Sequence, residues 1–139
     1  MSRTVTLYPS VQQRLLIDCT IGVPDTLNPI RDAQTVICHG LIDTGAMVSA
    51  ISKRVSDFME LAVTGGMELL TANGHADVVD THIVNVGLGG DVRFPMMQVP
   101  CIEMDDEDLI IGMDILSQGD LAITNSGGKT VFMFKLDGE

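Results

Sequence analysis

Leu41-Ile42-Asp43-Thr44-Gly45-Ala46 is the stretch that decides how this chain folds. The apolar run that begins with Val36 and Ile37 delivers a single acid into a Thr-Gly turn. An ionised carboxylate directly after a buried strand is costly unless hydrogen bonds satisfy it or a reaction uses it. Gly45 allows a close backbone approach, and Thr44 supplies a hydroxyl that can lock the loop. Asp43 is therefore either a structural turn residue or a functional carboxylate at the end of a strand.

A second apolar run follows far downstream and also ends in a glycine. It reads Leu109-Ile110-Ile111-Gly112-Met113-Asp114-Ile115-Leu116, and it faintly echoes the first. Between the two runs, Asn73-Gly74 separates strand-like segments at 67–71 and 76–86. Asn-Gly is a strong hairpin signal, because both residues tolerate positive φ. The sequence therefore predicts a β-hairpin between the two apolar runs.

The rest of the chain is punctuated at short intervals by Gly, Asn, Asp and Pro, so that the apolar runs are strand-sized. A helix is expected at 53–62, with Ser52 as N-cap and Gly65-Gly66 as the stop, and a shorter one at 113–118. The segment 24–32 is expected to be a loop. Further strands are expected at 15–21, 34–42, 50–51, 91–99, 109–111, 121–124 and 130–136. The pattern predicts one all-β domain over 1–139, with one or two short helices and a core within about 15–135.

Composition narrows the possible functions. The formal charge of −11 argues against binding to nucleic acid or to an anionic membrane surface. It fits either simple solubility or a preference for basic or neutral substrates. No run is long enough to span a membrane, and the N-terminus lacks the pattern of a signal peptide, so a cytoplasmic location is expected.

Few aromatic residues are available, 4% with no Trp, so an aliphatic, Met-rich core is expected, with Met96, Met97 and Met104 as core or pocket filler. Three cysteines without Cys-x-x-Cys spacing are expected to be buried free thiols. The three histidines show no metal-ligand spacing, and the acidic stretch 105–108 lacks the ligand pattern of a calcium loop. No metal and no cofactor are therefore predicted.

The two apolar runs and the hairpin between them, in this order and spacing, resemble the retropepsin-like aspartic proteases, the single-lobe family that includes the retroviral proteases. The matching blocks are 41–52, 71–75 and 109–116. The resemblance implies a closed, barrel-like β-sheet with a flap hairpin. It also implies aspartic endopeptidase activity on a peptide or protein substrate.

The chemistry of that family needs two carboxyls close together, which share one proton because both cannot ionise. This chain has one Asp-Thr-Gly and no Asp-Ser-Gly, since His82 follows Asp80-Thr81 and Leu27 follows Asp25-Thr26. The second catalytic aspartate must then come from a second copy of the chain. A two-fold axis through the site brings the same residue to itself, so a homodimer is predicted.

The resemblance also implies a role for each matching residue. Asp43 is the shared acid and base, Thr44 locks the two loops across the dyad, and Gly45 offers its carbonyl to the substrate. Ala46, Met47 and Val48 line subsites, and the hairpin tip closes over an extended peptide. The tip comprises Ala72, Asn73, Gly74 and His75, and Ile110, Ile111 and Gly112 wall the pockets and buttress the loop. His75 departs from the glycine-rich tip of viral relatives.

Two other functions stay open from the sequence. One is a retropepsin-like dimerisation or peptide-binding module with weak or no catalysis. The other is a zymogen-like protein that is active only when fused or processed. The intact Asp43-Thr44-Gly45-Ala46 motif favours an active endopeptidase.

Overall fold

The computed structural model describes residues 2–25, 34–70 and 73–136. Two helices, α1 and α2, and a 3₁₀ turn at Ser126–Gly128 accompany the strands. The helices span Lys53–Met59 (α1) and Met113–Leu116 (α2). The strands are β1 Arg3–Leu7, β2 Leu16–Gly22, β3 Thr35–Ile42, β4 Ala50–Ser52, β5 Gly65–Leu70, β6 Ala76–Gly87, β7 Arg93–Ile102, β8 Leu109–Ile111, β9 Gly119–Thr124 and β10 Val131–Leu136.

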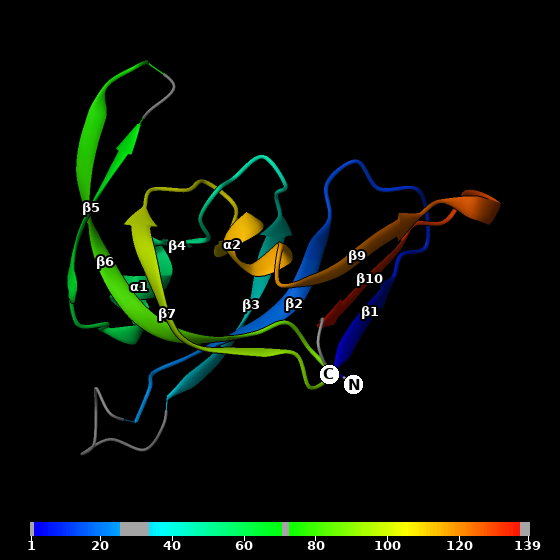
Figure 1. The fold of residues 1–139 in the computed structure, drawn as a ribbon, viewed down its shortest axis with the longest axis horizontal. Helices are drawn as coiled ribbons and strands as arrows, with labels where there is room; N and C mark the ends of the chain where they lie inside the picture. Colours follow the sequence, from blue (N-terminus) through cyan, green and yellow to red (C-terminus); the bar gives the residue numbers. More distant parts are fainter. Residues whose placement is uncertain (1, 26–33, 71–72, 137–139) are drawn as a thin grey trace.

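Most of these strands form one sheet that closes on itself. Within the described residues its order is β2-β3-β8-β4-β7-β6-β5, and β2 also pairs with β6. This pairing joins β2, β3, β8, β4, β7 and β6 into a closed barrel of six strands, which Figure 1 shows curving around the core. β5 pairs with β6 alone, so the β5–β6 hairpin projects from the barrel. The predicted all-β, barrel-like fold with a hairpin and short helices is confirmed.

The two apolar runs of the sequence pair with each other. β8 lies between β3, to which it is parallel, and β4, to which it is antiparallel. In register, Gly40 faces Leu109, Leu41 faces Ile110 and Ile42 faces Ile111. The chain therefore leaves the barrel after β3, makes the Asp-Thr-Gly loop, and returns along β4 on the far side of β8.

A second, three-stranded sheet has the order β1-β10-β9 and is antiparallel throughout. The strands β9 and β10 were predicted, whereas β1 was not. Phe132 and Phe134 of β10 are fully buried against the barrel, so this sheet closes one end of the core.

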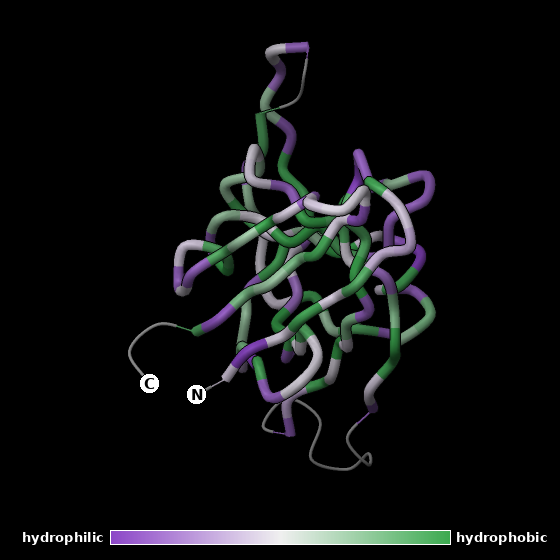
Figure 2. Tube along the Cα trace, turned by 90° about the vertical axis from the view of Figure 1, so that its right-hand side faces the viewer, coloured by the Kyte–Doolittle hydropathy of each residue, from purple (hydrophilic) through white to green (hydrophobic). Residues whose placement is uncertain are grey.

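The core contains fewer methionines than expected. Among the described methionines, Met59 lies in the buried cluster and Met97 is partly buried against it, as expected of Met97, whereas Met47 and Met96 are 85% and 50% exposed. Phe94, Phe132 and Phe134 fill the centre together with Val, Leu and Ile. The expectation of a Met-rich core is therefore wrong, because three of the few aromatic residues are placed inside. Figure 2 shows the apolar residues along the barrel strands and polar residues at the projecting ends.

The two short helices begin where the sequence predicted and end earlier. Ser52 caps α1, with its hydroxyl accepting a hydrogen bond from the Val55 N–H at 3.2 Å. The helix ends at Glu60, which has a left-handed φ of 52°, and not at Ala62. Of the described residues, none belongs to a helix that is both long and apolar enough to span a membrane. The predicted loop at 24–32 falls largely outside the described residues.

Candidate active site

Asp43 continues the hydrogen-bonded ladder one step beyond the end of β3. Its N–H donates to the carbonyl of Ile111 at 3.0 Å, directly after the register pair Ile42–Ile111. On the other edge of β3, the Ile42 N–H donates to the Leu15 carbonyl at 2.9 Å. The backbone of Asp43 is thus fixed by β8, and the position of its carboxylate follows from the pairing of the two apolar runs.

The loop folds tightly back on the acid. The Ala46 N–H donates to the Asp43 carbonyl at 3.2 Å, and the Gly45 N–H donates to Asp43 Oδ1 at 2.9 Å. A Cβ at position 45 would lie 3.2 Å from that same oxygen, so glycine is used here for close approach. The side chain of Asp43 is half-buried, and no other described residue is hydrogen-bonded to Oδ2. One carboxylate oxygen is therefore held by the loop and the other is left available.

The loop is also fastened to α2. The N–H groups of Met113 and Asp114 donate to the carbonyls of Ala46 and Met47, at 2.8 and 3.1 Å. A Cβ on Gly112 would lie 2.8 Å from the carbonyl oxygens of both Ala46 and Val48. The glycine that ends the second apolar run is thus needed for the loop and helix to approach this closely.

Asp114 and Ser49 complete this attachment, and neither was among the predicted site residues. The Asp114 carboxylate accepts from the Ser49 N–H at 3.0 Å, from Ser49 Oγ at 2.7 Å and from the Ile115 N–H at 2.9 Å. Ser49 Oγ in turn accepts from the Gly112 N–H at 3.0 Å. Both residues lie inside the matching motifs. The signal that could have identified them was a hydroxyl and an acid on two segments that must meet.

The remaining predicted loop and wall residues differ in exposure. Thr44 and Met47 are exposed, the latter at 85%, while Ala46 and Val48 are half-buried. These four residues follow the acid along one short loop. Along β8 the side chains alternate, so that Ile110 is half-buried and Ile111 is fully buried. Ile111 therefore supports the loop through its carbonyl, and its side chain belongs to the core.

The predicted hairpin is present. β5 and β6 pair as far as Leu70 and Ala76, and Gly74 has the expected positive φ of 79°. Asn73, Gly74 and His75 are exposed, while Ala72 lies outside the described residues. Figure 1 shows the hairpin and the loop between β3 and β4 rising from the same end of the barrel. The hairpin side chains of Leu70 and Val78 are 77% and 76% exposed.

The acidic stretch that precedes β8 is anchored by arginines. Arg14 pairs with Glu107, and Arg54 donates to Asp108 at 2.7 Å. Partial burial alone would raise the pKa of Asp108. The hydrogen bonds from the His39 N–H and from Arg54 outweigh this effect and hold the pKa below its ordinary value. Two of the four acids therefore fix the entry to β8 and are not simply solvated.

Comparison with known proteins adds a family and a fold. The family model described as "gag-polyprotein putative aspartyl protease" matches residues 34–118, which contain the Asp43 loop, the hairpin and the second apolar run. A search of curated proteins finds no match.

Two solved structures are similar to this chain over nearly its whole length. A retropepsin-like aspartic protease from Rickettsia conorii is 16% identical, with 95% of this chain and 92% of that chain covered, at a TM-score of 0.56. The retroviral protease-like domain of Ddi1 from Leishmania major is 22% identical, with 93% and 92% covered, at a TM-score of 0.52. At these identities the likeness is one of fold.

Proposed function

The chain belongs to the gag-polyprotein putative aspartyl protease family, and we propose that it is an aspartic endopeptidase that works as a homodimer. The observation that carries this proposal is the state of Asp43. Its Oδ1 is held by the Gly45 N–H, while Oδ2 has no hydrogen-bond partner among the described residues. A single such carboxylate is half of the pair that this chemistry needs, so a second copy supplies the other half.

In the proposed reaction, one Asp43 of the pair is ionised and the other carries the shared proton. The ionised carboxylate takes a proton from water as the water oxygen attacks the peptide carbonyl carbon. The protonated carboxyl gives its proton to the carbonyl oxygen, which produces a neutral tetrahedral diol. As the diol collapses, the carboxyl that took the water proton gives a proton to the peptide nitrogen, the other carboxylate takes a proton from a diol hydroxyl, and the carbon–nitrogen bond breaks. The two carboxyls are then back in their starting states, with one proton shared between them.

The neighbouring groups support this chemistry without taking part in proton transfer. Thr44 and the carbonyl of Gly45 are placed on the same exposed turn, where they can meet the partner loop and the peptide backbone. The β5–β6 hairpin is the proposed lid, which holds an extended peptide as an added strand and excludes water. The predicted subsite roles of Ala46, Met47, Val48 and Ile110, and the cytoplasmic location, stay predictions from the sequence.

One observation favours a second candidate. The Gly45 N–H bond to Oδ1 is also what a structural Asx turn would make, so a peptide-binding or dimerisation module without catalysis has the same local geometry. The two candidates differ in turnover, which depends on proton exchange at Asp43, and not in fold.

The test combines sedimentation with peptide cleavage. The purified protein should sediment at micromolar concentration at about twice the 14.9 kDa chain mass. It should cleave members of a mixed peptide library, most rapidly on the acid side of neutrality. The Asp43→Asn variant should lose cleavage and keep its fold, because an amide preserves the shape but cannot accept the proton.

Asp18→Asn is the matched control, because it also neutralises one exposed aspartate, on β2 and away from the loop. It should leave cleavage unchanged. Binding of peptides without cleavage by the native dimer would favour the second candidate. A monomer at all concentrations would contradict the two-fold site.

A further inference from the structure

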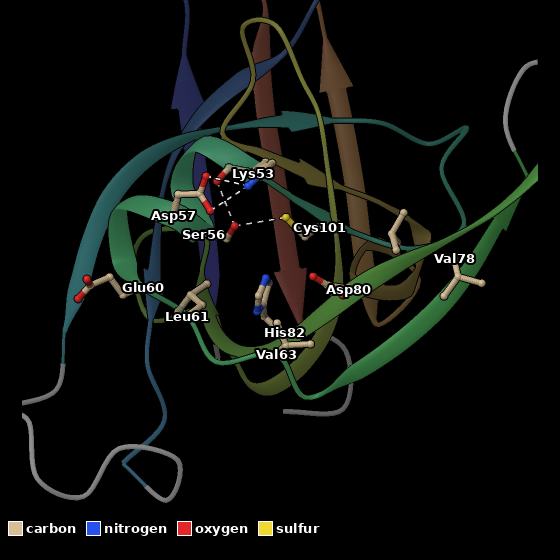
Figure 3. A pocket seen from close by; sticks show the side chains of 11 residues that line it. Lys53, Ser56, Asp57, Glu60, Leu61, Val63, Val78, Asp80, His82 and Cys101 are labelled. Carbon is tan, nitrogen blue, oxygen red and sulfur yellow. Dashed lines mark hydrogen bonds and ion pairs between the residues drawn. The ribbon is translucent and has the colours of Figure 1, made fainter.

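A separate cavity lies beside the stem of the β5–β6 hairpin, away from the Asp43 loop. Its volume is about 540 Å³. Figure 3 shows α1 along one side and β6 with the end of β7 along the other. The lining residues are Lys53, Ser56, Asp57, Glu60, Leu61, Val63, Val78, Val79, Asp80, His82 and Cys101. None of them transfers a proton in the reaction proposed above, although Val78, Val79 and Asp80 belong to the proposed lid hairpin.

The most informative group in this cavity is His82. The residue is 4% exposed, and its Nδ1 lies 2.8 Å from the Ala62 carbonyl oxygen. A carbonyl oxygen can only accept, so Nδ1 carries a proton, and Nε2 is the nitrogen that holds the lone pair when the ring is neutral. Within the described part of the chain, Nε2 has no hydrogen-bond partner. No fully buried side-chain nitrogen or oxygen of the described residues lacks a hydrogen-bond partner, so Nε2 is open to the cavity, where an incoming donor can bind it.

The other polar groups of the cavity are also mainly hydrogen-bond acceptors. Asp80 lies two residues before His82 on the same face of β6, and its exposed carboxylate has no hydrogen-bond partner among the described residues. The possible donors are already occupied. The Lys53 ammonium binds Asp57 at 2.9 Å, and Ser56 Oγ donates to the Lys53 carbonyl at 3.0 Å. The cavity therefore offers acceptors and negative charge, and few free donors.

The remaining walls are aliphatic. Leu61, Val63, Val78 and Val79 provide an apolar lining next to the acceptors. We propose that this cavity binds an aliphatic cation, whose ammonium or guanidinium group donates to His82 Nε2 and Asp80 while its methylene stem packs on the apolar wall. The end of a lysine or arginine side chain of a bound polypeptide and a free polyamine share this chemistry. The cavity volume is within the range of ligand sites, and the chain charge of −11 attracts cations.

Occupancy of the cavity would reach the hairpin. Val78, Val79 and Asp80 belong to the part of β6 that carries the hairpin away from the barrel. An occupant contacts this stem and restricts its motion relative to α1. Only this consequence rests on the proposed function, in which the hairpin is the lid; the binding site itself does not.

Cys101 lines the cavity, and its reactivity can report whether the cavity is occupied. Cys101 is half-buried and lies 3.2 Å, between Sγ and Oγ, from Ser56. Cys19 and Cys38 are buried, and the hydrogen bond between them together with burial raises the pKa of Cys19. Iodoacetamide should therefore alkylate Cys101 first, and an occupant of the cavity should slow that reaction.

The experiment measures the rate of Cys101 alkylation by peptide-mapping mass spectrometry, in the Asp43→Asn variant so that no substrate is cleaved. We expect n-butylammonium to slow the reaction in a saturable way and n-butanol, its neutral analogue, to have no effect at the same concentration. Equal protection by both compounds, or no protection by the cation, would overturn the proposal. The readout does not depend on activity, so its failure is distinct from failure of the proposed protease function.

Two variants test the named contacts. Asp80→Asn removes the exposed carboxylate and should raise the butylammonium concentration for half-protection about tenfold. His82→Asn keeps a donor for the Ala62 carbonyl and removes Nε2, and a similar loss is expected if it folds. In Asp18→Asn, the charge-matched control on β2, butylammonium should protect Cys101 as well as it does in the parent. Unchanged protection in Asp80→Asn would refute the assignment even if His82→Asn did not fold.

A last comparison distinguishes a polypeptide side chain from a free polyamine as the bound cation. N-acetyl-lysine-methylamide represents a polypeptide side chain and spermidine represents a polyamine, and both are compared with butylammonium. Stronger protection by one of them identifies the source. Failure of both at concentrations where butylammonium protects would refute the assigned ligand class.

Discussion

Replacing Asp114 by alanine should loosen the Asp43 loop without touching Asp43. The Asp114 carboxylate accepts three hydrogen bonds, two of them from Ser49. The Ile115 N–H keeps the Gly112 carbonyl at 3.2 Å as an alternative acceptor, so the loss falls on Ser49. Hydrogen bonds to a charged acceptor contribute about 1.5–3 kcal/mol each. Asp114 is half-buried, so water can replace part of the lost hydrogen bonding. We therefore expect Asp114→Ala to lower the free energy of unfolding by about 2–4 kcal/mol.

The assay is urea unfolding followed by circular dichroism at fixed protein concentration, together with peptide turnover under folding conditions. Turnover should fall in proportion to the displacement of the loop, because the attachment to α2 is then reduced to the bonds accepted by the Ala46 and Met47 carbonyls and by Ser49 Oγ. Ser49→Ala removes the hydroxyl that joins Asp114 to the Gly112 N–H. In a double-mutant cycle, the two changes should couple by about 1 kcal/mol.

A loss below about 0.5 kcal/mol for Asp114→Ala, within the range of an ordinary surface change, would refute the reasoning. Strictly additive effects of Asp114→Ala and Ser49→Ala on the free energy of unfolding would also refute it. Asp18→Asn is again the control, because it removes an exposed carboxylate that pairs with His39 and not with the loop.

Three further changes test other parts of the structure. Gly112→Ala places a Cβ 2.8 Å from two backbone oxygens of the loop and should lower the free energy of unfolding by about 1–3 kcal/mol, measured by urea unfolding; unchanged stability would contradict the close packing. A Cβ at Gly74 would meet no atom within 4 Å, so in Gly74→Val the strain of the left-handed φ should fall on the exposed turn, changing the thermal midpoint little and reducing peptide turnover; unchanged turnover would remove the lid assignment. The folded pKa of Asp108 is below the ordinary 3.8, so its contribution to stability is present above pH 3.8 and is lost as the pH falls through the folded value. Arg54→Gln should therefore flatten the pH dependence of stability below pH 3.8, and an acid-unfolding curve identical to that of the parent would refute the pairing.

The parts of the fold that follow local rules could be predicted from the sequence. β8 was placed at 109–111, Ser52 was identified as a helix cap, and the hairpin was found from Asn-Gly. The end of α1 was missed because the apolar spacing continues past Glu60. Backbone bonds from Glu60 and Leu61 to the Asp57 and Ser56 carbonyls close the helix there. The spacing of apolar residues gives no information about these backbone hydrogen bonds at the end of the helix.

β1 was missed because its alternation is inverted. Val5 and Leu7 point outward, at 46% and 74% exposed, while Thr4 is buried. The rule that apolar residues face the core therefore gives no strand signal here. Asp114 was missed for a different reason: its partners, Ser49 and Gly112, are set by the meeting of two distant segments. The position of Asp43 at a strand end was predictable, but the hydrogen bonds that hold its loop were not.

The pairing of β3 with β8 has a consequence for the order of events during synthesis. The Asp43 N–H finds its acceptor on Ile111, and the Ala46 and Met47 carbonyls find their donors on α2. All of these partners lie far downstream, so a nascent chain that has emerged only as far as the hairpin cannot form the loop. Contacts between such distant segments form slowly, because the chain loses the entropy of loop closure before the contacts can stabilise it. The loop of the proposed active site can therefore form only after the chain has been translated past Ile111 and α2 and these segments have folded against it.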